Sequence, residues 1–516
     1  MHVLSQAVLL AAGEPGEDAV LASLSPRFSV HGAGRPHSVH RTWLDTFDWR
    51  LHRAGLTLEY VTGRRPAELV LTGPDGDLVS QQASGLSWPA RAGDLPTGPA
   101  RDRLVSVAGI RALLPAARAV SRVRDLRVLN ADAKTVAWLT VDRTTVSYPE
   151  AAQLPARLQV TAVRGYQPQA KRVAELLAAA AGPAGPARSP LDAALAAAGR
   201  RAEDYSSKLD IQLAPDMPAR LALRAVLLNL LDTIQVNVPG TLRDIDTEFL
   251  HDLRVAVRRT RSALKLAGDV LPAGPAGRFG PEFKWLGDLT TPTRDLDVYL
   301  LGYQDMADSL VSAKPAELSP FHDHLAVQRG MEQRRLARGL RSARFSRVMG
   351  DWRSTLAGLG PAQGGPRAVD LATARLRRAH QRVLRQGRAI SPASPPERLH
   401  DLRKRCKELR YLLEFFASLF DPAAHQRAVR DLKGLQDCLG EFQDRQVQQH
   451  ELREFASQMM ADRDTPATAL LAMGELAGQL GLRQQAARDE FAGRFHDFAS
   501  RASERRFRVL TAGTSR

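Results

Sequence analysis

The spacing of hydrophobic residues divides the chain near residue 210. Before that point, short runs of aliphatic and β-branched residues alternate with turn signals such as Pro74-Asp75-Gly76. The expected strands cover 68–72, 77–80, 136–141 and 158–163, and the expected helices cover 108–119, 168–181 and 192–198. Residues 1–210 are therefore predicted to form an α+β domain built on an antiparallel sheet.

Beyond a boundary marked by Pro215 and Pro218, apolar residues recur at the spacing of amphipathic helices. A Gly/Pro-rich break at 358–366 separates two halves, at about 215–357 and 367–510. The expected helices cover 220–236, 248–271, a segment from 281 through 298, one or two segments within 320–356, 369–387, a segment from 398, 426–460, 466–481 and 484–507. Residues 211–516 are predicted to form an all-α domain, a pseudo-repeat of two helical bundles.

One four-residue motif occurs twice, 149 residues apart, as His251-Asp-Leu-Arg254 and His400-Asp-Leu-Arg403. The same offset relates residues that follow the motif. The pairs are Lys284 and Lys433, Leu286 and Leu435, Asp288 and Asp437, and Asp295 and Asp444. Because charged positions keep the offset, the chain contains an internal repeat, with a period too long for a short-unit solenoid.

Each copy of the motif opens a predicted helix that carries cations along one face. At about 100° per residue, these positions lie together, and apolar positions such as Leu402, Cys406 and Leu409 lie opposite. The first stripe is His251, Arg254, Arg258, Arg261 and Lys265, and the second stripe is His400, Arg403, Lys404, Lys407 and Arg410. Like charges at i and i+4 repel by roughly 0.2–0.5 kcal/mol, and solvated faces usually mix signs. Two such stripes in register favour an anion-binding site over an ordinary solvated face.

Carboxylates follow each stripe on the next predicted helix. In an antiparallel helical hairpin, Asp295 would lie at the height of His251, and Asp444 at the height of His400. Asp288 and Asp437 lie two turns earlier on the same faces. Two interpretations stay open. The carboxylates could orient the histidines and arginines toward a ligand, or they could form ordinary salt bridges between helices.

The charge balance points to an acidic partner. The formal net charge is +16, and residues 211–516 hold 47 of the 72 Lys/Arg and 36 of the 56 Asp/Glu residues. Polyphosphates, nucleic acids and anionic membrane surfaces are the partner classes expected. The two cysteines predict neither a disulfide framework nor a cysteine metal site. The apolar run at 7–12 lacks the flanks of a signal peptide, and Arg224 and Asp232 interrupt 221–238, so a cytoplasmic protein without a membrane span is expected.

The repeated motifs resemble the CHAD domain (conserved histidine α-helical domain) over residues 215–510. The resemblance rests on His251-Asp-Leu-Arg-Val-Ala-Val-Arg-Arg259 with Trp285 and Arg294-Asp-Leu-Asp297, and on His400-Asp-Leu-Arg-Lys-Arg-Cys-Lys-Glu-Leu-Arg-Tyr411 with Leu432-Lys-Gly-Leu-Gln-Asp-Cys-Leu-Gly-Glu-Phe-Gln-Asp-Arg445. It implies binding of inorganic polyphosphate along a basic surface or pore between the bundles. The polyphosphate-binding positions would be both stripes together with Lys284 and Lys433, supported by Asp288, Asp295, Asp437 and Asp444.

The first domain resembles the CYTH, or triphosphate-tunnel, fold. Residues 43–58 are similar to its Tyr-Asp-Thr and Ala-Gly run, and Lys208-Leu209 to its closing motif. The expected Glu-x-Glu-x-Lys strand is absent before Trp43, Gln159-Val-Thr161 stands where a late Glu-x-Glu is expected, and Glu59-Tyr-Val61 replaces a basic cluster. Without those carboxylates, Mg²⁺ or Mn²⁺ would lack ligands, so a degenerate, inactive domain is predicted. Arg122, Arg124 and Arg127 could give it weak anion affinity.

These observations predict a non-enzymatic polyphosphate-binding protein, without a cofactor or metal site, that could associate with polyphosphate granules. Protonation of His251 and His400 would strengthen binding below about pH 6.5. Non-specific nucleic-acid binding is an alternative, but aromatic residues make up only 6% of the chain and do not interleave with the stripes. Metal-dependent triphosphatase activity and phosphohistidine chemistry are further alternatives. The missing acids argue against the first and the lack of a Gly-rich nucleotide loop against the second.

Overall fold

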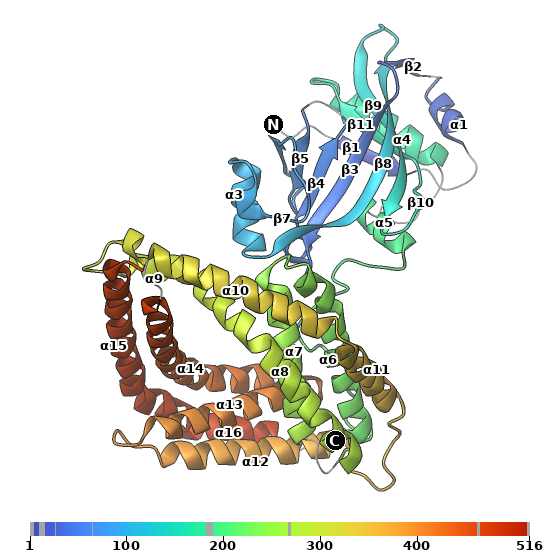
Figure 1. The fold of residues 1–516 in the computed structure, drawn as a ribbon. Coiled ribbons are helices and arrows are strands. Elements are labelled where there is room, and N and C mark those ends of the chain that lie inside the picture. Colours follow the sequence, from blue (N-terminus) through green and yellow to red (C-terminus); the bar gives the residue numbers. More distant parts are fainter. Residues whose placement is uncertain are drawn as a thin grey trace. The chain divides into compact units, whose positions relative to one another are not determined.

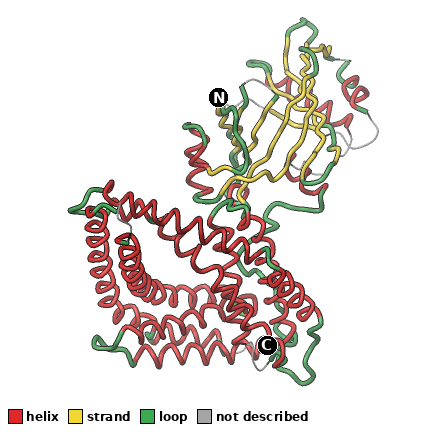
Figure 2. Tube along the Cα trace, viewed as in Figure 1, coloured by secondary structure: helices red, strands yellow, loops and turns green. Residues whose placement is uncertain are grey.

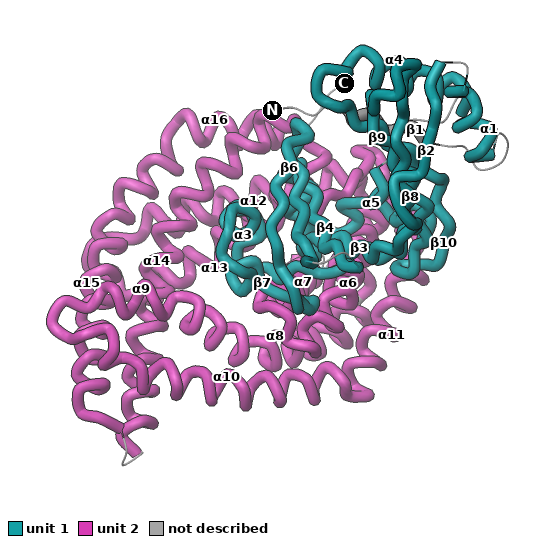
Figure 3. Tube along the Cα trace, turned by 90° about the horizontal axis from the view of Figure 1, so that it is seen from above, with its two compact units in different colours: residues 1–206 teal, residues 207–516 magenta. Residues whose placement is uncertain are grey.

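The structure, a computed structural model, describes residues 5–9, 16–25, 27–63, 66–181, 189–266, 270–461 and 465–512. The chain forms two compact units, residues 1–206 and residues 207–516 (Figure 3). The first unit contains a large sheet, and the second is helical throughout its described elements (Figures 1 and 2). The predicted fold class, an antiparallel α+β domain followed by an all-α domain, is confirmed.

The first unit is built on an 11-stranded sheet in which the described strand pairs are all antiparallel. Its main path runs β1-β11-β9-β8-β3-β4-β5-β6, and β2, β7 and β10 pair beside it. The strands are β1 Ser5–Leu9, β2 Ser29–Gly32, β3 His37–Thr46, β4 Thr57–Thr62, β5 Glu68–Thr72, β6 Leu78–Gln82, β7 Ala90–Arg91, β8 Ala112–Leu129, β9 Thr135–Tyr148, β10 Ala152–Gln153 and β11 Arg157–Ala162. The helices are α1 Glu17–Ala22, α2 Arg50–Arg53, α3 Pro99–Ala108, α4 Gln167–Ala181 and α5 Pro190–Ala197, with a 3₁₀ turn, η1, at Ala92–Asp94.

The predicted strands correspond to β5, β6, β9 and β11, and the helices predicted at 168–181 and 192–198 correspond to α4 and α5. The helix predicted at 108–119 is wrong, because α3 ends at Ala108 and the long strand β8 begins at Ala112. Its start reads Ala-Leu-Leu-Pro-Ala-Ala and is largely buried, so the strand lacks the alternation of a one-sided strand. The register against β3 shifts between Trp43 and Leu44, next to Pro115, where a strand tolerates proline.

The second unit consists of eleven α-helices and two 3₁₀ turns in its described residues. They are α6 Ala219–Leu242, α7 Thr247–Leu266, α8 Ala273–Leu301, α9 Tyr303–Asp308, η2 Pro315–Leu318, α10 Ser319–Leu340, α11 Ala343–Ala357, α12 Ala368–Arg388, α13 Pro396–Phe415, η3 Ala417–Leu419, α14 Pro422–Met460, α15 Ala467–Phe498 and α16 Arg501–Leu510. The offset of 149 residues reappears in the helix starts, since α12, α13 and α14 begin that far after α6, α7 and α8.

The two halves of this unit are joined by a reciprocal backbone contact. Ala219 N donates to Pro366 O at 2.9 Å, and Ala368 N donates to Met217 O at 2.8 Å. Donors and acceptors of the two bonds are again 149 residues apart, and Pro218 and Arg367 form a β-bridge between them. The starts of α6 and α12 are therefore related by an approximate twofold arrangement.

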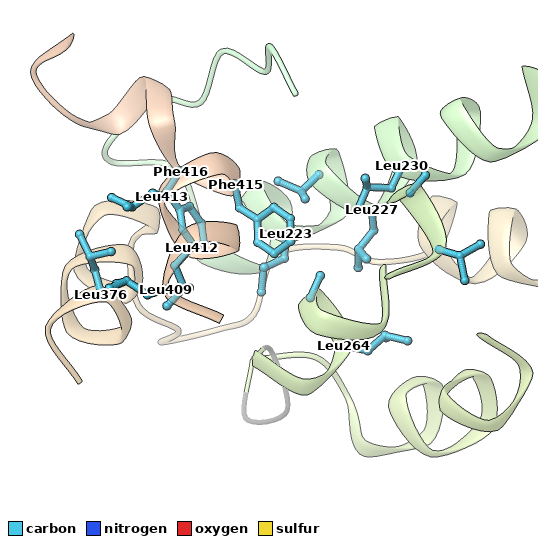
Figure 4. Packing of buried hydrophobic residues seen from close by; sticks show 14 of the residues in the cluster. Leu223, Leu227, Leu230, Leu264, Leu376, Leu409, Leu412, Leu413, Phe415 and Phe416 are labelled. Atoms are coloured by element: carbon cyan, nitrogen blue, oxygen red, sulfur yellow. The ribbon is translucent and has the colours of Figure 1, made fainter. Parts of the chain in front are cut away.

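The halves also share one hydrophobic core. Figure 4 shows Leu223, Leu227 and Leu230 of α6 in the same cluster as Leu409 and Leu412 of α13. A second cluster joins the C-terminal part of α8 and the N-terminal part of α10 to the C-terminal part of α14 and the N-terminal part of α15, through residues such as Leu325 and Leu476. The two predicted bundles thus pack as one helical body rather than around separate cores.

Three predicted helix limits are corrected. The helix expected from Pro281 begins at Ala273. The first stripe helix, expected to reach 271, is described as far as Leu266; residues 267–269 lie outside the described residues, and residues 270 and 271 are not helical. The segments expected at 466–481 and 484–507 form one helix, α15, followed after Phe498 by α16. Gly481 does not end α15. A Cβ at Gly481 would lie 2.9 Å from Gln449 Nε2 of α14, so this glycine permits a close approach of two helices.

One described helix, α6, is long and apolar enough to cross a membrane. Half of its apolar window is buried inside the protein, and its leucines belong to the shared core. This burial is typical of the core helix of a water-soluble domain.

Candidate anion-binding site

The two stripe helices, α7 and α13, contact each other within the second unit. Their apolar faces enter the shared core, where Leu253 and Val257 of α7 and Leu402 and Cys406 of α13 are fully buried. Amphipathic helices that bury one face must present the other away from the core. The stripes therefore lie on exposed or half-buried surface on both helices.

A pocket of about 430 Å³ lies between α7 and α13, and we call it the basic pocket. Its lining residues are Arg258, Arg261, Ser262, Lys265, Leu266, Asp401, Lys404, Arg405, Lys407, Glu408 and Tyr411. Five of the predicted stripe positions line it: three from α7 and two from α13. Residues that are 149 positions apart in the repeat are thus brought to one site.

Three charged residues of the basic pocket are not predicted by the spacing of the stripes. Arg405, Asp401 and Glu408 lie beside the second stripe rather than on it, and the contact between α7 and α13 brings them to the same pocket. The helical periodicity of one segment carries no information about which flank its neighbour covers. The pocket therefore holds six cations and two carboxylates, and not stripe cations alone.

Glu408 is the fixed counter-ion of the basic pocket. Its carboxylate lies 2.9 Å from Lys265 Nζ and 3.0 Å from Arg405 Nη1, and Arg382 of α12 is 3.7 Å away. Burial raises the pKa of Glu408, but the hydrogen bonds from Lys265 and Arg405 outweigh it and hold that pKa below its ordinary value. Asp401 lies 3.3 Å from Lys404, and both side chains are mostly exposed.

The stripe arginines at equivalent positions have equivalent partners. Arg254 is 3.8 Å from Asp295 and also donates to Thr291 Oγ1, while Arg403 is 2.8 Å from Asp444. Burial lowers the pKa of Arg254, and the neighbouring arginines lower it further despite Asp295. Burial likewise raises the pKa of Asp295 above its ordinary value. Each of these charged groups is therefore only partly compensated.

The histidines that open the stripes are half-buried. His400 Nδ1 is 2.6 Å from Gln443 Oε1 of α14, the residue before Asp444. The predicted helical hairpin does bring the start of α13 beside this part of α14. The carboxylate contacts that the structure shows, however, go to the arginines one turn after the histidines.

Lys407 lies close to cations from both stripes. It is half-buried, and its pKa is lowered to about 7, first by burial and then by Arg258 and Arg403. Arg254 acts in the same direction, and Asp444 opposes it. Positive charges from both stripes thus converge on one point, and the carboxylates present do not neutralise them. An anion would supply the missing charge.

The remaining predicted positions lie outside the lining of the basic pocket. Arg410 is 2.7 Å from Glu414, which also accepts from Arg259 at 2.7 Å. Lys284 and Asp288 form an exposed pair along α8 at 2.8 Å. Lys433 and Asp437 are exposed on α14.

The first unit contains a different charged cluster, on one face of its sheet. Arg41 of β3 lies 2.9 Å from Glu59 of β4 and 3.0 Å from Asp142 of β9, and Trp43 Nε1 donates to Glu59. Burial lowers the pKa of Arg41, but these two carboxylates outweigh it and raise that pKa. An arginine therefore already compensates both carboxylates. No group of three or more His, Cys, Asp or Glu side chains in the described residues could hold a metal ion.

The three arginines considered for weak anion affinity lie on β8. Arg124 is 2.5 Å from Glu17 of α1, and Arg143 of β9 is 2.8 Å from the same carboxylate. Arg122 and Arg127 are exposed. No local pattern predicts either partnership, because Glu17 reaches Arg124 from α1 and Asp142 reaches Arg41 from β9.

Residues 225–453, from α6 into α14, match the CHAD domain family model. Among solved structures, the chain is similar to the CHAD domain from the plant Ricinus communis (27% identity, 58% of this chain and 97% of that chain, TM-score 0.49). It is also similar to PptA from Streptomyces chartreusis (17% identity, 54% of this chain and 99% of that chain, TM-score 0.44). A third similar structure is a provisionally named adenylate cyclase from Bacillus halodurans (14% identity, 37% of this chain and 95% of that chain, TM-score 0.27). None of the curated proteins matches the chain.

Proposed function

Since residues 225–453 match the CHAD domain family model, we propose that the chain binds inorganic polyphosphate in the basic pocket and does not transform it. The observation that carries the proposal is the convergence of Arg254, Arg258, Arg403 and Lys407 on one half-buried point. Cations held this close repel one another unless an anion joins them. A polymer that carries one negative charge per unit can meet several of these cations in succession.

The residues of the basic pocket suit phosphate oxygens. Arginine offers a planar fork of donors, and lysine a compact charge, and hydrogen bonds between charged groups are the strong ones. Arg258, Arg261 and Lys265 follow one another at about one turn of α7, roughly 5 Å along its axis. The Lys265–Glu408 pair is partly exposed, and such pairs contribute about 0–1 kcal/mol, so phosphate can displace it.

The non-enzymatic part of the proposal is supported by the first unit. There, Arg41 already bridges Glu59 and Asp142, so these carboxylates are occupied by a protein cation. In the basic pocket, no described residue is arranged as a nucleophile with a hydrogen-bonded general base. Binding alone would bring the chain to polyphosphate granules in the cytoplasm.

The experiment is a titration of the full chain with long-chain polyphosphate, beside single-stranded DNA of equal total charge, across a salt series. A second titration uses a variant with Arg254, Arg258, Lys407 and Arg410 changed to alanine. We expect polyphosphate to bind more tightly than DNA and the variant to lose most of that affinity. Equal affinity for the two polymers, or an unchanged variant, would overturn the proposal.

A further inference from the structure

Lys407 differs from the other two lysines of the basic pocket. Lys265 is 69% exposed and pairs with Glu408, and Lys404 is 58% exposed and lies 3.3 Å from Asp401. No carboxylate in the described part of the chain forms an ion pair with Lys407, which is only partly exposed. In the first half of the repeat, 149 residues earlier, the same position is Arg258. The pocket therefore holds one half-buried amine, Lys407, and the equivalent position in the first half of the repeat carries a guanidinium.

The groups that face Lys407 come from three helices. From α7 come Arg254 and Arg258, from its own helix Arg403, and from α14 the carboxylate of Asp444. Asp444 is already 2.8 Å from Arg403 and is 61% exposed, so it compensates little of the charge at Lys407. On the α12 side, Arg382 is directed to Glu408. The net surroundings of Lys407 are cationic.

A cluster of cations reduces its mutual repulsion when its strongest acid, the group with the lowest pKa, loses a proton. Arginine stays charged in proteins, whereas a lysine that is buried beside other cations gives up its proton. The proton therefore leaves from Lys407, whose pKa is lowered to about 7. The product is a neutral amine at the wall of an anion-binding pocket. A neutral amine beside cations is the arrangement of a nucleophilic lysine.

We infer that Lys407 is an acylation site, which reacts with small acyl phosphates that the surrounding arginines capture by their phosphate group. The inference rests on the proposed function, because it requires the basic pocket to bind phosphate. The nitrogen lone pair attacks the acyl carbon, and the bond from that carbon to the phosphate oxygen breaks. Phosphate leaves with the bonding electron pair beside Arg258 and Arg403, and the nitrogen releases a proton to solvent. The products are an amide at Lys407 and inorganic phosphate.

Acylation would change the function of the pocket. The amide nitrogen can no longer become charged, so the pocket permanently loses the cation that a bound polyanion would restore at Lys407. Acylation and polyphosphate binding therefore compete for one atom. A cell rich in acyl phosphates would hold less of the chain on polyphosphate.

The test is acetylation of the full chain by acetyl phosphate, with mass spectrometry that resolves each lysine. At pH 7.5, we expect Lys407 to react at least about tenfold faster than Lys404 and Lys265, because ordinary lysines are almost wholly protonated there. The Lys407 rate should level off above about pH 8, while the Lys404 rate keeps rising toward pH 10. In Arg258→Gln, the Lys407 profile should shift to higher pH, because one repelling charge is removed.

Inorganic tripolyphosphate and long-chain polyphosphate separate this inference from the proposed function. If both bind and slow the reaction of Lys407, both conclusions are supported. If polyphosphate binds but Lys407 reacts no faster than Lys404, the inference is overturned and the proposed function is supported. If Lys407 reacts fast but neither polyanion binds or protects it, the proposed function is overturned, and so is the capture of acyl phosphates by their phosphate group.

Discussion

The two stripe helices differ at their C-terminal ends, where Lys265 of α7 corresponds to Glu414 of α13. On α7, Arg261 and Lys265 are exposed and both line the basic pocket. On α13, Glu414 binds Arg410, and neither residue lines the pocket. Glu414 thus pairs with Arg410, which is absent from the lining of the basic pocket.

The helices that follow the stripe helices, α8 and α14, also differ between the two halves. Arg261 Nη1 of α7 passes so close to Gly287 of α8 that a Cβ there would lie 2.9 Å from it. The counterpart of Gly287 is Gln436 of α14, whose side chain donates to Cys406 O. The first half leaves space for an arginine where the second half has a hydrogen-bonded side chain. The repeat therefore predicts the position of a charged residue along its helix, but it does not predict whether the side chain of that residue lines the basic pocket.

The largest effect is expected where the two stripes meet. Changing Arg258 and Lys407 together to alanine should weaken polyphosphate binding by at least about 100-fold, because each loses a charged hydrogen bond of roughly 1.5–3 kcal/mol. The slope of log affinity against log salt should become shallower by about 1–2. Isothermal titration at three salt concentrations measures both. The matched control, Lys284 and Lys433 to alanine, removes the same charge outside the pocket and should cost less than about threefold.

A similar loss in that control would show that net charge, and not the basic pocket, determines binding.

A charge reversal should convert the first stripe into a copy of the second. Lys265→Glu places an acid four residues after Arg261, as Glu414 is placed after Arg410. The new carboxylate should pair with Arg261 and repel Glu408, so polyphosphate affinity should fall by about tenfold. Fluorescence anisotropy with labelled polyphosphate measures the change. Lys265→Gln is the control and should cost only about two- to threefold; equal losses for the two variants would argue against a repeat-specific effect.

The pH dependence should distinguish Lys407 from its twin, Arg258. Because the pKa of Lys407 is lowered to about 7 in the free protein, and a bound polyanion raises it, binding takes up a proton above about pH 7. Affinity should therefore fall by up to about tenfold between pH 7 and 9. In Lys407→Arg, this fall should disappear, because arginine stays charged. A fall of the same size in that variant would assign the proton to another group.

The same shift has a consequence for folding. An unfolded chain binds a proton at Lys407 up to about pH 10.4, and the folded chain only up to about pH 7. The unfolded state therefore holds more protons between these values, so this group makes the free energy of unfolding rise as pH increases from 7 to 10. Below pH 7, both states are protonated, and the cost of burying the charge is fully present.

The smallest effect is expected at the supporting carboxylates. Asp444→Asn removes a mostly exposed partner of Arg403, and we expect affinity to rise by about twofold because a competing negative charge is lost. Asp295→Asn should act likewise on Arg254. Competition titrations resolve such a difference. A fall in affinity would mean that these carboxylates orient the arginines toward the ligand, which is the other interpretation of their position.

Much of the helical unit could be predicted because its signals are local and repeated. The offset that relates His251 to His400 also relates the starts of three helices. What failed depends on contacts between distant segments. Glu408 enters the basic pocket only because α7 lies beside α13, and Asp142 reaches Arg41 through strand register. A buried strand at 112–119 and a helix share the same apolar composition, and only the neighbouring strands decide between them.

The paired bonds from Ala219 to Pro366 and from Ala368 to Met217 have the form of an isologous interface, in which each partner gives what it receives. The two halves stand to each other as the subunits of a twofold dimer that one chain has joined. In a true homodimer, every substitution appears twice. Joined in one chain, the halves can change separately, so Lys265 can remain basic while its twin has become Glu414. The covalent linkage thus allows a pseudo-symmetric fold to carry an asymmetric charge distribution. The C-terminal end of the stripe is cationic in the first half, and in the second half an acid neutralises it.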